Sequence, residues 1–124
     1  MNNKLSKVIL IADDDDGNYF LLEHYLSGFY CKVIRATNGL EAVNICKERT
    51  DIDLVFMDMR MPVMDGLEAS KIIQKINSKI PIIIITAFAY DDNELEKFKK
   101  NCNKVETKPI SIQKIDSIFS ELLI

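Results

Sequence analysis

The sequence lacks several features that would place a protein in a membrane or a secretory class. No apolar run approaches the roughly 20 residues that a membrane-spanning helix needs. The first residues, Met1–Lys4, lead into an apolar stretch that is too short for a signal peptide. We therefore expect a cytoplasmic protein with no membrane partner.

Cysteine, histidine and excess positive charge are also scarce. The three cysteines, Cys31, Cys46 and Cys102, are odd in number and widely spaced, which argues against a disulfide framework or a zinc site. Thiols in apolar surroundings are usually buried packing residues. The only histidine, His24, lies within an expected helix and is interpreted as a packing or surface residue. A net charge of −3 gives no general attraction to nucleic acid, so we expect no nucleic-acid partner.

What the sequence does contain is a regular alternation of two hydrophobic periodicities over its 124 residues. Short apolar runs predict strands at Lys7–Ala12, Cys31–Arg35, Leu54–Met57 and Ile82–Thr86, with a weaker strand near Val105. After each strand, apolar residues recur at helical spacing, which predicts helices over Leu22–Phe29, Glu41–Glu48, Ala69–Ile76, Leu95–Cys102 and Ile112–Leu122. Such alternation predicts one α/β domain with a parallel sheet covered by helices on both faces.

Polar residues gather where the expected strands end. Asp13 and Asp14 follow the first strand, Asp58 follows the third, Thr86 closes the fourth, and Lys108 comes after the fifth. Open α/β sheets bind their ligands at the carboxyl ends of the strands. These five residues are therefore the candidate functional site.

The residue types at this edge favour phosphoryl chemistry. Three neighbouring carboxylates repel one another unless a cation lies among them, and few oxygen ligands with room for water suit magnesium. A lysine and a threonine hydroxyl add a fixed positive charge and a hydrogen-bond donor, which stabilise phosphoryl oxygens. Asp58 would act as the nucleophile and form an acyl phosphate.

Four stretches resemble the receiver (phosphoacceptor) domain of two-component response regulators and hybrid histidine kinases. They are ILIADDDDGN, LVFMDMRMPVMDG, IIIITAFA and VETKPI, in order and at suitable intervals, and the resemblance runs from Lys7 to the last helix. It implies a flavodoxin-like, doubly wound (βα)5 fold with the strand order 2-1-3-4-5. It also implies phosphorelay signalling, in which a sensor histidine kinase or a histidine phosphotransfer protein donates the phosphoryl group.

Matching positions carry the family's site residues onto this chain. The resemblance implies that Asp58 is the phosphoacceptor, that Asp14 ligates Mg²⁺ (or Mn²⁺) directly, and that Asp13 acts mainly through water. The backbone carbonyl of Arg60 would be a further protein ligand. We expect such a domain to catalyse its own phosphorylation and dephosphorylation without being a turnover enzyme.

The same resemblance assigns the remaining polar residues of the site. Thr86 would bond one phosphoryl oxygen and Lys108 would pair with another. Pro109 follows Lys108 where the family often has a cis peptide bond, and Gly66 fits a tight backbone approach after the third strand. We expect residues 1–124 to form a single receiver domain without an output domain.

Other interpretations of the acidic run remain to be weighed. Acidic residues before a helix cap its free N–H groups, and we favour that role for Asp15 and Asp16. An EF-hand calcium loop starting at Ala12 is a near match, but Ala12 offers no side-chain ligand and a strand precedes it. The pair Asp51 and Asp53 mimics the aspartates of haloacid-dehalogenase-type phosphatases, but it precedes a strand instead of following one.

Two departures from the family pattern bear on regulation. Val105 stands where the family usually has an aromatic ring that swings inward on phosphorylation, so the usual switch is in doubt. Arg60 and Phe88 offer no carboxamide to orient a hydrolytic water, so we predict slow autodephosphorylation, over minutes to hours.

The output would be a conformational change read by a protein partner on the face of the fourth helix, fifth strand and fifth helix. The alternative is a pseudo-receiver that docks a partner without being phosphorylated.

Overall fold

The computed structural model describes residues 6–123, in which five strands and five helices alternate strictly along the chain. The strands are β1 (Lys7–Ala12), β2 (Cys31–Ala36), β3 (Leu54–Asp58), β4 (Ile82–Thr86) and β5 (Lys104–Thr107). The helices are α1 (Asp16–Leu26), α2 (Gly39–Glu48), α3 (Gly66–Ile76), α4 (Asp92–Lys99) and α5 (Ile112–Leu122).

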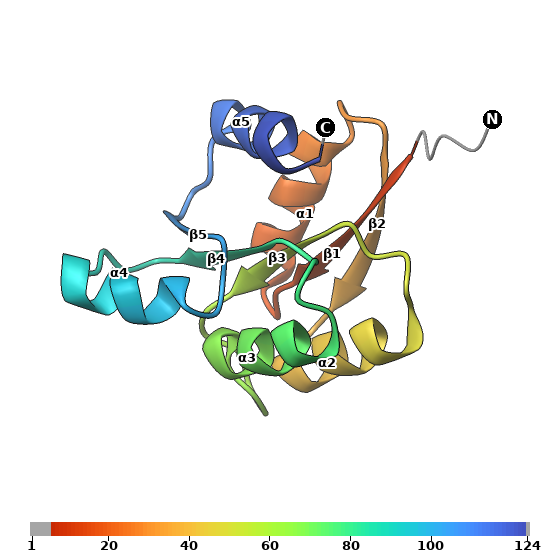
Figure 1. Ribbon diagram of the computed structural model, residues 1–124. Helices are drawn as coiled ribbons and strands as arrows, with labels where there is room; N and C mark the ends of the chain where they lie inside the picture. Colours follow the sequence, from red (N-terminus) through yellow and green to blue (C-terminus); the bar gives the residue numbers. More distant parts are fainter. Residues whose placement is uncertain (1–5, 124) are drawn as a thin grey trace.

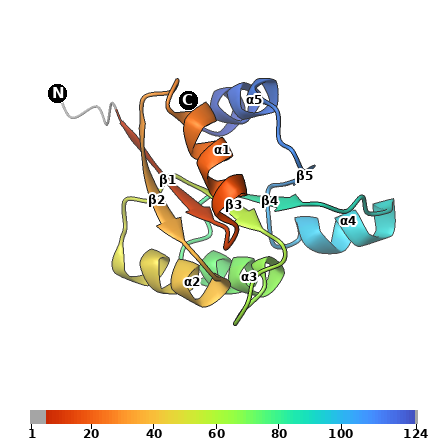
Figure 2. The ribbon, with the colours of Figure 1, turned by 180° about the vertical axis from the view of Figure 1, so that it is seen from behind.

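All strands are parallel and form one sheet in the order β2-β1-β3-β4-β5. Helices α1 and α5 cover one face of the sheet and α2 and α3 cover the other, while α4 lies beside the β4–β5 edge (Figures 1 and 2). This is the flavodoxin-like doubly wound architecture that the sequence predicted. Its strand order brings β1 and β3 together at the centre, so the carboxyl ends of these strands are neighbours.

The core has two parts, one on each face of the sheet. Along β1, Val8, Leu10 and Ala12 pack on the α2–α3 side, whereas Ile9 and Ile11 pack on the α1–α5 side. The side chains of a strand alternate between the two faces of a sheet, and both faces are covered here. Every residue of β3 and β4 is buried, which explains why these strands read as unbroken apolar runs.

Short polar side chains begin the helices as the sequence indicated. Asp15 caps α1 by accepting a hydrogen bond from the Asn18 N–H, and Asp91 caps α4 in a reciprocal capping box with Glu94.

Two helices are shorter than their apolar spacing predicted. Helix α1 ends at Leu26 and α4 at Lys99, so Phe29 and Cys102 lie in the segments that follow them. Both side chains still pack against the core, which is why the periodicity continued past the helix ends.

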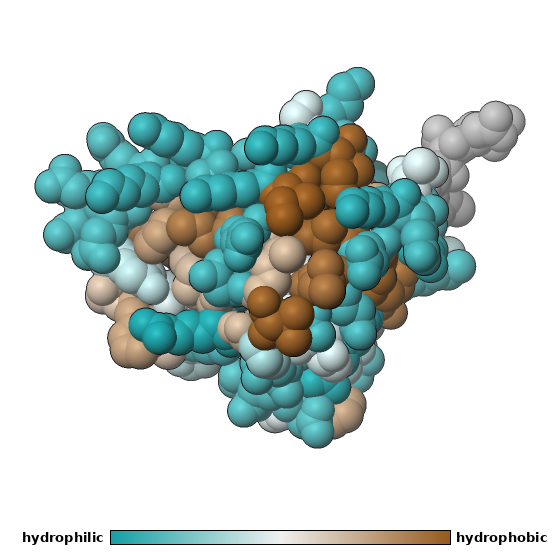
Figure 3. Space-filling view, turned by 90° about the horizontal axis from the view of Figure 1, so that it is seen from below, coloured by the Kyte–Doolittle hydropathy of each residue, from teal (hydrophilic) through white to brown (hydrophobic). Residues whose placement is uncertain are grey.

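The α2–α3 side of the surface is mostly hydrophilic, with apolar side chains gathered in one area (Figure 3). Exposed large apolar residues of α2, α3 and the loop before α3 include Leu40, Val63 and Ile76. Within residues 6–123, no helix has the length and apolar character to cross a lipid bilayer.

Candidate functional site

The acidic turn between β1 and α1 supplies two carboxylates to the site. Asp13 directly follows β1 and is 6% exposed, while the side chain of Asp14 is exposed to solvent. Asp58 is the last residue of β3 and is 7% exposed. Carboxylate oxygens of these three residues lie within 4.8 Å of one another. The structure thus brings together the three side chains that the sequence predicted as metal ligands.

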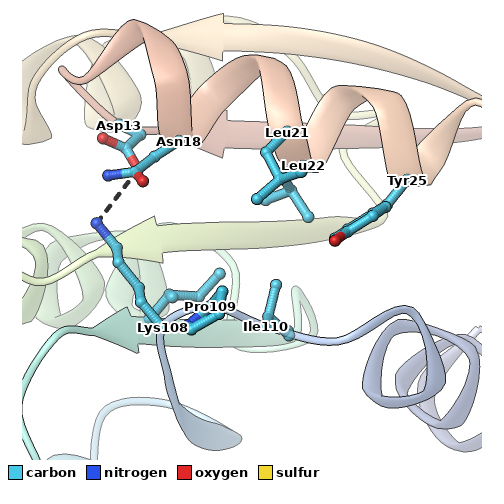
Figure 4. Close-up of a pocket in the computed structure, with 9 residues that line it drawn as sticks. Asp13, Asn18, Leu21, Leu22, Tyr25, Lys108, Pro109 and Ile110 are labelled. Atoms are coloured by element: carbon cyan, nitrogen blue, oxygen red, sulfur yellow. Dashed lines mark ion pairs between the residues drawn. The ribbon is translucent and has the colours of Figure 1, made fainter.

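Lys108 reaches the same cluster from the end of β5. Its ammonium Nζ lies 3.0 Å from Oδ1 of Asp58 and 3.6 Å from Oδ2 of Asp13, the ion pair marked in Figure 4. The Lys108 N–H donates to the Thr86 carbonyl over 2.7 Å, and the Lys108–Pro109 peptide bond is cis, as expected. The lysine is therefore anchored to β4 through its main chain while its side chain points back to Asp58.

Thr86 closes β4 and its hydroxyl has two partners within the protein. Its Oγ1 accepts the Phe88 N–H over 3.2 Å and donates to the phenol oxygen of Tyr90 over 3.5 Å. The Tyr90 ring stands edge-on to Phe98 of α4, with ring centroids 4.6 Å apart. Tyr90 thus connects the site threonine to α4, a contact that sequence reasoning missed. The residue at the family's usual aromatic position, Val105, is only partly buried.

Burial dominates the electrostatics of Asp58. Loss of water around its carboxyl group raises the pKa of Asp58 above its ordinary value. The hydrogen bond from Lys108 acts in the opposite direction, and the charges of Asp13 and Asp14 raise this pKa further. A cation added among these carboxylates would oppose the upward shift and favour the ionised form of Asp58.

The loop from β3 to α3 passes very close to Asp58. A Cβ atom on Gly66 would collide with the Asp58 backbone carbonyl, so this position needs glycine for close approach. The Gly66 N–H donates to the Met59 carbonyl over 2.9 Å, and Val63 at the loop tip has a φ of 72°. That φ is unfavourable for a β-branched residue. The loop therefore carries local strain beside the site.

Arg60 and Phe88 lie together at the rim of the site. The Arg60 guanidinium carbon is 4.9 Å from the centroid of the Phe88 ring, a cation–π arrangement. These are the two side chains that the sequence analysis placed beside the path of a hydrolytic water. They form a stacked pair across the β3–α3 and β4–α4 loops.

A cavity of about 240 Å³ extends from Asp13 and Lys108 along α1. Asn18, Leu21, Leu22 and Tyr25 of α1 line one side of it, and Pro109 and Ile110 face them from the segment before α5 (Figure 4). Its lining is mainly apolar apart from the end at Asp13, Asn18 and Lys108. The site is therefore continuous with an apolar groove between α1 and the end of β5.

The competing interpretations of the acidic residues do not fit this geometry. Ala12, the first position of the supposed calcium loop, is 1% exposed inside β1, so the EF-hand interpretation is wrong. Asp53 precedes β3 at the opposite edge of the sheet, where its Oδ2 accepts the Val8 N–H over 2.8 Å. The phosphatase-like aspartate pair therefore lies away from Asp58.

The donor set at the site suits a hard divalent cation. All three donors are carboxylates, they converge from two adjacent strands, and two of them are buried. Oxygen-only donors with one solvent-exposed member match Mg²⁺, which keeps several of its waters. The residues present therefore fit the metal that this kind of fold implies.

Taken together, the fold and the site define a flavodoxin-like α/β domain with a lysine-paired acidic cluster at the carboxyl edge of its sheet. A family model described as the response regulator receiver domain matches residues 9–120. The chain belongs to this family, the receiver domains of two-component response regulators.

Relatives and solved structures agree with this assignment. The chain is 32% identical over 121 residues to the polar-differentiation response regulator DivK of Brucella anthropi, covering 95% of this chain and 98% of DivK. It is 36% identical over 115 residues to the transcriptional regulatory protein ZraR of Klebsiella oxytoca. That match covers 93% of this chain but only 26% of ZraR, so the chain spans about a quarter of that relative's length.

Among solved structures, the receiver domain of a sensor histidine kinase from Pseudomonas aeruginosa superposes with a TM-score of 0.84 at 26% identity. The match covers 95% of this chain and 98% of the other. That structure has a magnesium ion coordinated in its active-site cleft. The acidic cluster of the present chain is consistent with the same kind of site.

Proposed function

We propose that this receiver domain accepts a phosphoryl group on Asp58 from a phosphohistidine of a sensor histidine kinase or a histidine phosphotransfer protein. One observation carries the proposal: Lys108 lies 3.0 Å from a buried carboxylate at the end of a central strand. A carboxylate oxygen of Asp58 would attack phosphorus as the phosphorus–nitrogen bond breaks. The histidine would leave as neutral imidazole, because its other ring nitrogen carries a proton.

The surrounding residues would bind and orient the transferred group. Asp13, Asp14, Asp58 and the backbone carbonyl of Arg60 would hold Mg²⁺ (or Mn²⁺), which supplies positive charge to the phosphoryl oxygens. Lys108 would move from the Asp58 carboxylate to a phosphoryl oxygen, over a short distance. The Thr86 hydroxyl, now shared with Phe88 and Tyr90, would donate to another phosphoryl oxygen.

The output would be a conformational change read by a protein partner on the face formed by α4, β5 and α5. The contact from Thr86 through Tyr90 to Phe98 supports this, because it joins the site to α4. Ion pairs from Lys104 to Glu121 and from Lys114 to Glu106 place paired opposite charges on this face. Such a surface suits a protein partner better than DNA or a membrane, and we expect that partner in the cytoplasm.

Loss of the phosphoryl group would be slow. A water molecule attacking phosphorus would have to pass the stacked pair of Arg60 and Phe88, which provides no carboxamide to orient it. We therefore expect a phosphorylated lifetime of minutes to hours. A half-life of seconds after removal of the phosphodonor would contradict this part of the proposal.

The test is the intact mass of the protein after incubation with acetyl phosphate and Mg²⁺. We expect one added phosphoryl group, absent in Asp58→Asn and absent when EDTA removes the metal. Beryllofluoride with Mg²⁺ should bind the wild type in the same way. If neither an adduct nor beryllofluoride binding is found, the domain is a docking module that is not phosphorylated.

A further inference from the structure

Arg35 makes an unusual set of contacts behind the acidic turn. It lies near the end of β2, and its side chain is 21% exposed. Its Nε and Nη2 both donate to the backbone carbonyl of Asp13, over 3.3 and 3.1 Å. Its Nη1 lies 2.8 Å from Oδ1 of Asp16. A single guanidinium group thus connects the first and last residues of the run of four aspartates.

The guanidinium is itself held in place by α1. Its central carbon lies 4.5 Å from the centroid of the Tyr19 ring, and the Tyr19 hydroxyl donates to Glu23 over 2.8 Å. Burial and the neighbouring Glu23 raise the pKa of Tyr19 to about 12, so its hydroxyl keeps the proton that it donates. The Arg35 guanidinium is therefore held by a cation–π contact as well as by hydrogen bonds.

The carbonyl that Arg35 binds belongs to the peptide unit joining Asp13 to Asp14. Because a peptide unit is planar, holding its oxygen also fixes the direction in which the chain enters Asp14. The Asp13 N–H donates to the Ala36 carbonyl over 3.0 Å, and Oδ1 of Asp13 accepts the Asp15 N–H over 2.9 Å. The end of β2 thus restrains the turn from both sides of Asp13.

We propose that Arg35 is a positioning residue for the metal site: it orients the Asp13–Asp14 peptide so that the exposed Asp14 carboxylate points toward Asp13 and Asp58. The proposal rests on the metal binding set out under the proposed function. Arg35 reaches the main chain of Asp13 and the carboxylate of Asp16, so the cluster itself remains available to a cation. A lysine cannot replace it, since only the planar fork of arginine binds both partners in a fixed geometry.

The charge of Arg35 and its positioning role predict opposite changes in metal affinity for Arg35→Gln, which makes the proposal testable. Arg35 is a positive charge close to a cation site, so charge alone predicts that Arg35→Gln binds metal more tightly. Charge alone also predicts that Arg35→Lys leaves the metal affinity unchanged. Positioning predicts weaker binding in both variants, because each loses the two bonds to the Asp13 carbonyl. Groups that orient metal ligands typically change affinity by about 10- to 100-fold.

The experiment titrates Mn²⁺ into the protein and follows the free-ion signal by electron paramagnetic resonance. We expect the Kd for Mn²⁺ to rise about tenfold in Arg35→Lys, which keeps the positive charge, and somewhat less in Arg35→Gln, where loss of that charge offsets part of the effect. The matched control is Arg49→Gln, which also removes one arginine and its two bonds to Asp51, 2.9 and 2.7 Å long, near the start of β3. This control should bind as the wild type does, and circular dichroism at the titration temperature should show every variant folded.

The outcomes separate this inference from the proposed function. Tighter or unchanged Mn²⁺ binding in Arg35→Gln, with a wild type that binds normally, overturns the role of Arg35 alone. If Arg35→Gln does not fold, Arg35→Lys decides, since unchanged affinity there overturns the proposal. A wild type that binds no Mn²⁺ at millimolar concentration overturns the metal site and this role together.

Discussion

Removing one carboxylate from the acidic cluster should stabilise the metal-free protein. Carboxylate oxygens of Asp13, Asp14 and Asp58 lie within 4.8 Å of one another. At that distance two unit charges repel by about 0.9 kcal/mol in water and about 3.5 kcal/mol at an effective dielectric constant of 20. Asp14 is the exposed member of the cluster, so the lower figure applies to each of its two repulsions. Lys108 offsets part of this, and we expect Asp14→Asn to add about 1 kcal/mol to the free energy of unfolding.

Mg²⁺ should remove this stability advantage of the variant. A ligand that binds only the folded state at ten times its Kd stabilises by about 1.4 kcal/mol. The wild type should gain that amount with Mg²⁺, whereas Asp14→Asn, having lost a ligand, should gain much less. For a domain of this size, 1 kcal/mol corresponds to about 3–5 °C in Tm. The variant should therefore melt higher than the wild type in EDTA and lose that advantage at saturating Mg²⁺.

The assay is thermal unfolding followed by circular dichroism, in EDTA and in Mg²⁺, at constant ionic strength. The matched control is Asp116→Asn, which removes the same charge from an exposed position of α5. It should shift little in either condition. A lower Tm for Asp14→Asn in EDTA, or equal stabilisation of variant and wild type by Mg²⁺, would refute the reasoning.

Three further predictions concern other residues of the site. The pKa of Asp58 is raised in the folded state. The stability that this carboxyl group contributes is therefore greatest below its unfolded pKa near 3.8, and it is lost as the pH rises through the folded pKa. Without metal, Asp58→Asn should therefore be more stable to urea than the wild type at pH 7, and the difference in unfolding free energy should shrink toward pH 4. A difference that does not depend on pH would contradict this. Val63→Asn should raise Tm by about 2–4 °C, because asparagine tolerates the φ of 72° better than a β-branched side chain; an unchanged or lower Tm would count against strain in that loop. Phe88→Ala should shorten the half-life of the phosphorylated protein about two- to fivefold. This factor corresponds to the roughly 0.5–1 kcal/mol of the cation–π contact between Phe88 and Arg60. An unchanged half-life would show that this contact does not hinder water.

Much of the fold followed from the sequence because its strongest signals are local. Strands β3 and β4 are buried on both faces, so their apolar runs could be recognised without any knowledge of their neighbours. The convergence of the candidate site residues was predictable for a related reason. Asp13 and Lys108 follow strands and Asp58 ends one, and parallel strands bring their carboxyl ends to one edge of the sheet.

The contacts that sequence reasoning missed depend on side-chain direction and on register between strands. Arg35 reaches the Asp13 carbonyl because β1 and β2 pair with Ala12 opposite Ala36, a register that periodicity alone does not specify. Tyr90 reaches Thr86 through the shape of a loop that has no repeating pattern. The ends of α1 and α4 were overestimated because Phe29 and Cys102 continue the apolar spacing from outside the helices.

The packing of α4 has a consequence for how such a domain can diversify. All eight residues of α4 lie in the described part of the chain, and none of them is buried. Substitutions at its exposed positions, which exclude Leu95 and Phe98, would therefore change little of the core and none of the carboxylates around Asp58. Surface substitutions of that kind usually alter stability by less than about 0.5 kcal/mol. Gene duplicates of this domain could acquire new binding partners through α4 while keeping the same fold and the same acidic cluster.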